Sequence, residues 1–253
     1  IGQCVTLAGY LLFYFARPMH VKVNVANMKT TGNVMKNIYT IGIPATLNLA
    51  LPSIQVSALN AILAPFPGSY ILVLGVYYKL QTFIYLTANG IVQGIRPLVG
   101  YNYGAGEYDR VKKITHTSMG LIALVMVMGM AISCAIPQQL MGIFTDDSQT
   151  IIYGAEALKT YFFGFVFMSF MFTGQSTFTA LGYSKHAIFF SLLRKVIIVT
   201  PLAIILPRIG FGVMGVFLSE PVSNVIGGLA SFLTMYFTVY RKLKPQNTAL
   251  PER

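Results

Sequence analysis

Six long apolar stretches follow one another along this chain, and they constrain its fold more than any other feature. They cover residues 37–64, 70–99, 115–136, 149–181, 187–206 and 213–240. A helix crosses the hydrocarbon core of a bilayer with about 20 apolar residues. Only 10% of the chain is charged and 55% is hydrophobic, whereas about 25% of a soluble domain is charged. The sequence therefore predicts an all-α, polytopic transmembrane helical bundle.

The positive charges alternate between the loops and predict the orientation. One set of loops and the tail carry most of the Lys and Arg residues, at 17–36, 110–113, 185 and 241–244, whereas Arg208 is the single positive charge of the opposite loops. Loops rich in Lys and Arg stay on the cytoplasmic side. We therefore expect a cytoplasmic C-terminus. The net charge of +11 is explained by membrane orientation, so the expected partner is the lipid bilayer and not nucleic acid.

Three segments are expected. Residues 1–35 contain the end of a truncated transmembrane helix and a basic cytoplasmic loop, since the apolar run at 1–15 is too short to span. Residues 36–240 form a lobe of six helices, and 241–253 form a polar cytoplasmic tail. Because the chain begins inside an apolar run without Met, we expect that an N-terminal part precedes it.

Amide and lysine side chains interrupt three of the apolar stretches and indicate a polar cleft. Residues 75–113 combine an apolar helix, expected to stop at Arg96-Pro97, with a glycine-rich turn at 100–106. On this helix Asn89 and Gln93 share a face, and at about 100° per residue Lys79 lies within about 80° of Asn89. We interpret the turn as a structural hinge or packing element. The candidate cleft residues are Asn48, Gln55, Lys79, Asn89, Gln93 and Gln175.

Three further ionisable residues raise a choice between structural and functional roles. An ionisable group at membrane depth normally faces protein or a wet cavity. Arg194 and Glu220 lie on successive helices with a calculated offset of about 8 Å along the bundle, so we expect a buried ion pair. Glu156 is three residues before Lys159 on one helix face and can simply pair with it, or either of the two can face a cavity.

Catalytic and metal-binding motifs are absent from the sequence. It contains neither HExxH nor GxSxG, and GYNYGAG lacks the Lys-Ser/Thr of a phosphate-binding loop. We therefore expect no enzyme, no metal site and no cofactor.

An ordered set of short motifs resembles the C-terminal half of MATE multidrug efflux transporters, near the bacterial DinF- and MepA-like branch. The set covers nearly the whole chain. Its members are Gly42-Ile-Pro44, Gly94-Ile-Arg-Pro97, Gly100-Tyr-Asn-Tyr-Gly-Ala105, Arg110, Lys113, Ile143-Phe144-Thr-Asp146, Leu181-Gly-Tyr-Ser-Lys185 and Leu193-Arg194.

The resemblance implies one six-helix lobe, plus a partial preceding helix, of a two-lobed transporter in the bacterial plasma membrane. It also implies export of lipophilic or cationic drugs by alternating access, in exchange for H⁺ or Na⁺, with a missing N-terminal lobe as partner. Some branches place a coupling carboxylate on the seventh helix, but residues 37–64 contain no acid. The resemblance thus leaves coupling to the other lobe, Glu156 or Glu220. A lipid-linked oligosaccharide flippase of the same superfamily is the alternative, with Lys79 and Arg194 meeting a pyrophosphate.

Overall fold

The computed structural model describes residues 2–16 and 31–243, and these ranges are helical apart from turns, with no strand. The all-α prediction is confirmed. The chain divides into two compact units, residues 1–43 and 44–253. The first unit holds α1 (Gly2–Ala16) and the start of α2 (Gly32–Leu63). Of the basic loop expected up to residue 35, residues 17–30 lie outside the described residues, and α2 already begins at Gly32. The expected tail lies outside the described residues beyond residue 243.

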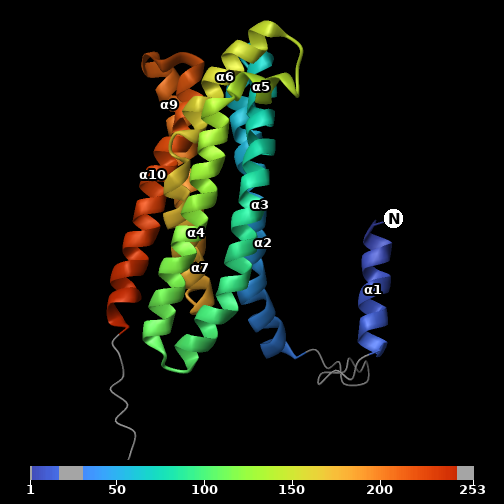
Figure 1. Cartoon of the computed structure of the whole chain (residues 1–253), viewed down its shortest axis with the longest axis vertical. Helices are drawn as coiled ribbons and strands as arrows, with labels where there is room; N and C mark the ends of the chain where they lie inside the picture. The colour runs from blue at the N-terminus through green and yellow to red at the C-terminus, as the bar shows by residue number, and fades with distance from the viewer. Residues whose placement is uncertain (1, 17–30, 244–253) are drawn as a thin grey trace, which may run out of the picture. The chain divides into compact units, whose positions relative to one another are not determined.

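Helices occupy all six predicted stretches, of which the first begins in the first unit and the other five lie in the second (Figure 1). The second unit contains α3 (Ser69–Gly104), α4 (Tyr108–Ala135), α5 (Pro137–Gly142), α6 (Ser148–Phe162), α7 (Met168–Ala180), α8 (Ser184–Leu192), α9 (Thr200–Leu206) and α10 (Gly212–Thr238). A 3₁₀ turn, Phe165–Phe167, joins α6 to α7, and a π-helical segment, Leu193–Val199, joins α8 to α9.

Four helical segments of the described residues are long and apolar enough to cross a membrane: 69–104, 108–135, 148–180 and 185–242. The last segment contains a chain reversal. Gly210 and Gly212 have φ angles of 109° and 54°, which glycine adopts without steric cost. The reversal lays α9 beside α10 (Figure 1). The segment 185–242 is therefore an antiparallel helical hairpin.

The expectation that the helix of the apolar stretch 70–99 stops at Arg96-Pro97 was wrong. α3 continues through Pro97 to Gly104. A proline removes one backbone donor, but Val99 and Asn102 beyond it are buried, and Asn102 donates a side-chain hydrogen bond to the Leu98 carbonyl at 2.8 Å. Packing of the last turns therefore outweighs the lost donor, and the turn begins only at Ala105.

An aromatic cluster joins α3, α6 and α10 in the core. The rings of Tyr77 and Tyr161 stack with centroids 3.7 Å apart, and Phe217 meets Tyr161 edge-on at 5.1 Å. All three side chains are fully buried. Aromatic pairs of this kind contribute about 0.5–1.5 kcal/mol beyond the apolar area they bury. The cluster thus fixes the spacing of three helices.

The two ends of the second unit differ in charge. Tyr70 contacts Tyr153 and Phe217, so the starts of α3, α6 and α10 share one end. There Asp147 caps α6 by accepting from the Thr150 backbone at 3.0 Å, and the Thr150 hydroxyl lowers the pKa of the Asp147 carboxyl. Val99, Val111 and Leu243 pack together at the opposite end. The opposite end is basic and carries Arg110, Lys112, Lys113, Lys185, Arg241 and Lys242.

Two glycines allow α10 to approach the 3₁₀ turn closely. A Cβ at Gly164 would lie 2.7 Å from the Pro221 carbonyl oxygen, and one at Gly228 would overlap the Phe167 carbonyl oxygen. Both obstacles are backbone atoms, which cannot move aside as a side-chain tip can. Small residues at helix contacts are the usual device for close packing in membranes.

We predict that Gly228→Ala lowers the stability of the full-length protein by about 1–3 kcal/mol, because the added methyl overpacks a backbone contact. Thermal unfolding in detergent measures the change. Gly75→Ala is the matched control, since Gly75 lies inside α3 with open space around it. Equal melting temperatures for Gly228→Ala and the wild type would contradict the close approach.

Candidate functional site

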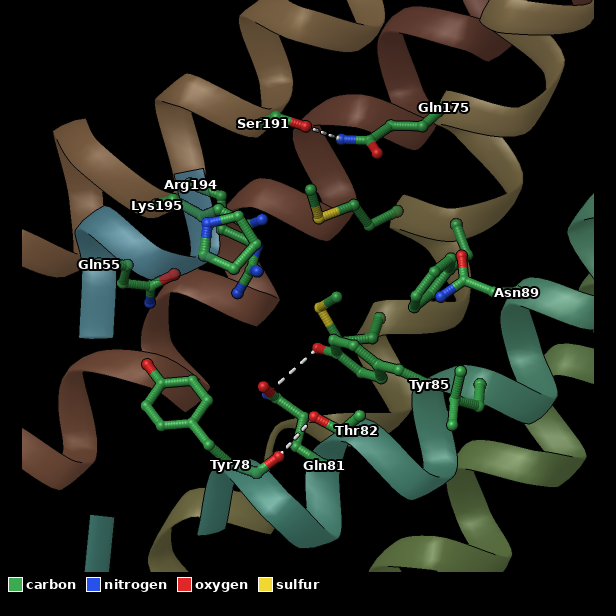
Figure 2. A pocket seen from close by; sticks show the side chains of 15 residues that line it. Gln55, Tyr78, Gln81, Thr82, Tyr85, Asn89, Gln175, Ser191, Arg194 and Lys195 are labelled. Atoms are coloured by element: carbon green, nitrogen blue, oxygen red, sulfur yellow. Dashed lines mark hydrogen bonds between the residues drawn. The ribbon is translucent and has the colours of Figure 1, made fainter. Parts of the chain in front are cut away.

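A pocket of about 340 Å³ lies within the second unit, between α2, α3, α7 and the α8–π-helix segment (Figure 2). Pockets that hold drug-sized molecules occupy about 300–1,000 Å³. Its wall mixes aromatic rings, methionines, amides and two cations. It is lined by Pro52, Gln55, Tyr78, Gln81, Thr82, Tyr85, Leu86, Asn89, Met168, Met171, Phe172, Gln175, Ser191, Arg194 and Lys195.

Helical spacing explains which residues of α3 reach the pocket. Tyr78, Thr82, Tyr85 and Asn89 follow one another at intervals of four, three and four residues and therefore share one face. Gln81 is buried beside them and donates to the hydroxyl groups of Tyr77 and Tyr85, the latter at 3.3 Å. This face presents two phenol rings and two amides to the pocket.

The same spacing builds the opposite wall. Met168, Met171 and Gln175 lie three and four residues apart on α7. The Gln175 amide donates to the Ser191 hydroxyl oxygen at 3.0 Å (Figure 2). Ser191 lies three and four residues before Arg194 and Lys195, and this places the two cations on the pocket side of the π-helical segment. π-Helical segments occur frequently at functional sites.

Behind the pocket wall, Arg194 and Glu220 form the expected ion pair. The Arg194 Nη1 lies 3.1 Å from the Glu220 Oε2, and the two side chains are 3% and 1% exposed. The same nitrogen donates to the Asn224 Oδ1 at 2.9 Å. Glu220 and Asn224 are one turn apart on α10 and present both acceptors to the guanidinium. A buried charge of this kind persists only where it is paired and hydrogen-bonded.

The second carboxylate oxygen of Glu220 extends this contact to two more helices. The Gln55 amide of α2 donates to the Glu220 Oε1, and the Tyr78 hydroxyl of α3 donates to the same oxygen at 3.3 Å. One carboxylate on α10 therefore holds side chains from α2, α3 and the π-helical segment. We call Glu220, Arg194, Gln55, Tyr78 and Asn224 the Glu220 network.

The structure brings some of the predicted cleft residues together and not others. Gln55, Asn89 and Gln175 line the pocket. Lys79 and Gln93 are exposed and do not line it. The offset of about 80° takes Lys79 off the pocket face, and its ammonium lies 5.2 Å from the centre of the Phe144 ring. The side chain of Asn48 lies outside the described residues.

Glu156 and Lys159 do not form the surface pair that their spacing allows. Both side chains are exposed on α6, and neither forms an ion pair within the described part of the chain. Among the two acids considered for ion coupling, Glu220 is therefore the buried one.

Sequence reasoning missed several residues of the site. Tyr78 and Tyr85 were not singled out, although their spacing from Asn89 is a readable signal. Lys195 was not singled out either, although it lies four residues after Ser191, about one helical turn away on the same side of the helix. The π-helical geometry of residues 193–199 was not predicted.

Comparisons with known proteins point to the same family that the sequence motifs resemble. The family model described as MatE matches residues 44–205. The multidrug export protein MepA of Staphylococcus aureus (strain NCTC 8325) is 28% identical over 235 residues, which cover 92% of this chain and 51% of that protein. MepA of Staphylococcus saprophyticus is 24% identical over 238 residues, covering 93% and 52%. The chain thus spans about half the length of these relatives.

Solved structures share the fold. A structure titled as MATE in the bent conformation superposes with a TM-score of 0.82 at 16% identity, covering 94% of this chain and 53% of that one. An outward-facing multidrug resistance transporter of the MATE family also gives 0.82 at 16% identity, with 94% and 54% covered.

We predict that Glu220→Gln lowers the stability of the full-length protein by about 3 kcal/mol, because removing one partner leaves a buried charge uncompensated. Adding Arg194→Gln should restore part of this loss. Thermal unfolding of both single variants and the double variant gives the coupling energy. The exposed Glu156→Gln serves as the control and should melt like the wild type. Additive effects of the two changes would show that the pair does not interact.

Proposed function

The chain belongs to the MatE family, and on that premise we propose that it forms one lobe of a multidrug efflux antiporter. In this proposal the lobe works with a second lobe, and the pair exports lipophilic or cationic drugs by alternating access in exchange for H⁺ or Na⁺. The chain's similarity to the MepA multidrug export proteins supports the class of activity.

The composition of the pocket wall is the observation that carries the proposal. Met168, Met171 and Phe172 supply polarisable and aromatic surface, while Gln81 and Asn89 supply amides. Methionine fills irregular spaces because its chain is flexible, and such surfaces repack around ligands of different shape. Tyr85 offers an aromatic face to a drug ring or cation. A wall of this kind suits many ligands better than one.

We assign ion coupling within this lobe to Glu220. A carboxylate binds either H⁺ or Na⁺ through the same oxygens, which already hold the donors of the Glu220 network. Binding of a cation there would compete with Arg194 for the carboxylate and would weaken the contact between α10 and the π-helical segment. The Glu220 carboxylate would then both bind the coupling ion and control the contact between α10 and the π-helical segment. Glu156, exposed on α6, offers no comparable connection.

We further propose that the basic end of the second unit faces the cytoplasm of a bacterial cell, with the protein in the plasma membrane. The end that carries Lys185 and Arg241 holds most of the positive charge, whereas the end with Asp147 holds Arg208. Positive loops are retained on the cytoplasmic side.

The flippase alternative is not favoured. Lys79 and Arg194 were the cationic cleft residues expected to meet a pyrophosphate in that case. Lys79 does not line the pocket, and Arg194 is bound to Glu220.

We predict that Asn89→Ala changes the relative export of different drugs by the full-length protein, because it removes an amide from the pocket wall. The measurement is efflux of ethidium and of a fluoroquinolone from a pump-deficient strain at matched expression. Gln93→Ala removes an amide one turn further along α3 that does not line the pocket, and should export both drugs like the wild type. Absence of any efflux by the wild type would refute the proposed function. If Asn89→Ala exports the two drugs in the same ratio as Gln93→Ala and the wild type, the pocket does not select between drugs.

A further inference from the structure

The basic end of the second unit has a surplus of positive charge. The six Lys and Arg residues named above lie there with two acidic residues at the start of α4, Glu107 and Asp109. Glu107 pairs with Arg110 at 3.8 Å. Asp109 is exposed and forms no ion pair within the described part of the chain. Most of the cations at this end are therefore without an acidic partner among the described residues.

An aromatic contact joins α4 to the end of α10 and gathers three of these cations. The Tyr240 hydroxyl and the His116 Nε2 share a hydrogen bond of 2.7 Å, and the two rings stack with centroids 5.3 Å apart. Lys112, one turn before His116 on α4, places its ammonium 5.9 Å from the centre of the Tyr240 ring. Tyr240 begins a 3₁₀ turn whose other two residues, Arg241 and Lys242, are exposed. Cations from two helices thus surround one tyrosine.

Burial of the next residue holds this turn in place. Leu243 is 6% exposed and packs against Val99 of α3 and Val111 of α4. Val111 directly precedes Lys112, and Leu243 directly follows the 3₁₀ turn. The positions of the cations therefore follow from packed core residues.

The parts of the chain outside the described residues carry little negative charge. Residues 17–30 contain no acid, and residues 244–253 contain Glu252 together with Lys244 and Arg253. Neither segment offers a net negative charge to the basic end. We therefore expect its complement to be an anion from outside this chain.

An exposed apolar face runs from these cations along each of the two helices. On α10, exposed apolar side chains recur every three or four residues and lead to Tyr240; they are Ile226, Leu229, Leu233 and Tyr236. On α4, an exposed face with the same spacing begins at His116 and continues through Gly120, Leu124 and Val127. Both helices pack against α7 and belong to candidate membrane spans. A ligand that matches both features has an anionic head and apolar chains.

We propose that an anionic phospholipid binds here, with its phosphate among Lys112, Arg241 and Lys242 and its acyl chains along the exposed faces of α4 and α10. We call these three cations, with His116 and Tyr240, the lipid site. Charged donors form short, strong hydrogen bonds with phosphate oxygens. Basic residues at the ends of membrane helices attract anionic headgroups, and tyrosine is enriched at the same depth because its ring is apolar and its hydroxyl is polar. The lipid site lies outside the pocket and does not depend on transport.

The test compares phosphatidylglycerol, which is anionic, with phosphatidylcholine of the same acyl chains, which has no net charge. Native mass spectrometry of the full-length protein in detergent measures the affinity for each lipid. The wild type should bind phosphatidylglycerol more tightly. Lys112→Gln and Arg241→Gln should each weaken this binding about fivefold, the effect of one cation near an anionic lipid, and the double variant about 25-fold. Binding of phosphatidylcholine should not change.

Two variants control for charge. Arg110→Gln also removes one cation from the start of α4, but Arg110 lies two residues before Lys112, about 200° around the helix, and is paired with Glu107. This variant should bind both lipids like the wild type. Lys112→Arg keeps the positive charge and should also bind phosphatidylglycerol like the wild type.

Equal affinity of the wild type for the two lipids would overturn the inference. Equal losses in Arg110→Gln and Lys112→Gln would overturn it too, because the surface charge as a whole would then attract the lipid. Glycerol phosphate, which has the phosphate without acyl chains, should not displace the lipid. Displacement at equal concentration would show a site for free phosphate in place of a lipid site.

Thermal unfolding in detergent gives a second measurement for variants that bind too weakly to detect. A ligand that binds only the folded protein raises its melting temperature. Phosphatidylglycerol should therefore raise the melting temperature of the wild type and of Arg110→Gln more than that of the double variant. An equal rise in all three would contradict the lipid site.

Discussion

A single buried carboxylate organises the functional part of this protein. Glu220 lies on α10 with almost no contact with solvent, and its two oxygens are held by Arg194 on one side and by Gln55 and Tyr78 on the other. The cost of removing both charges from water is large, and it is offset only while the pair and its hydrogen bonds are intact. The positions of α2, α3, α10 and the π-helical segment therefore depend on one another through this group. The pocket lies among three of these four elements.

Much of the fold was predictable from residue chemistry. Apolar length predicted the helices, and the basic loops predicted which helix ends lie together. The Arg194–Glu220 contact followed from helix rise, since two ionisable groups at similar depth on adjacent helices have few other partners. The end of α3 was predicted wrongly, because the rule that proline stops a helix does not account for the packing of Val99 and Asn102 beyond it.

The composition of the site was less predictable. Gln55, Asn89 and Gln175 were identified because amides are rare in apolar spans. Gln93 was chosen on the same ground and Lys79 as an ionisable group at membrane depth, and both lie off the pocket. A rotation of about 100° per residue shows on which face of a helix a side chain lies. It does not show how much of that face lines the pocket. Lys195 was not identified, although it lies about one helical turn after Ser191 on the side that lines the pocket.

The Glu220 network lies behind the pocket wall, where the charges of Arg194 and Glu220 balance each other. Arg194 also lines the pocket itself. Its guanidinium therefore connects the buried carboxylate with the pocket wall, and a change at Glu220 is able to reach the pocket through this one side chain.

The central claim is that Glu220 is an ionised carboxylate held by Arg194. Infrared difference spectroscopy of the full-length protein against Glu220→Gln, at neutral pH and without drug, measures this most directly. The account predicts that the difference spectrum contains the antisymmetric stretch of a carboxylate, and that this band shifts when Arg194 is replaced by Gln. A protonated carboxyl C=O stretch in its place, or a carboxylate band insensitive to Arg194, would contradict the account.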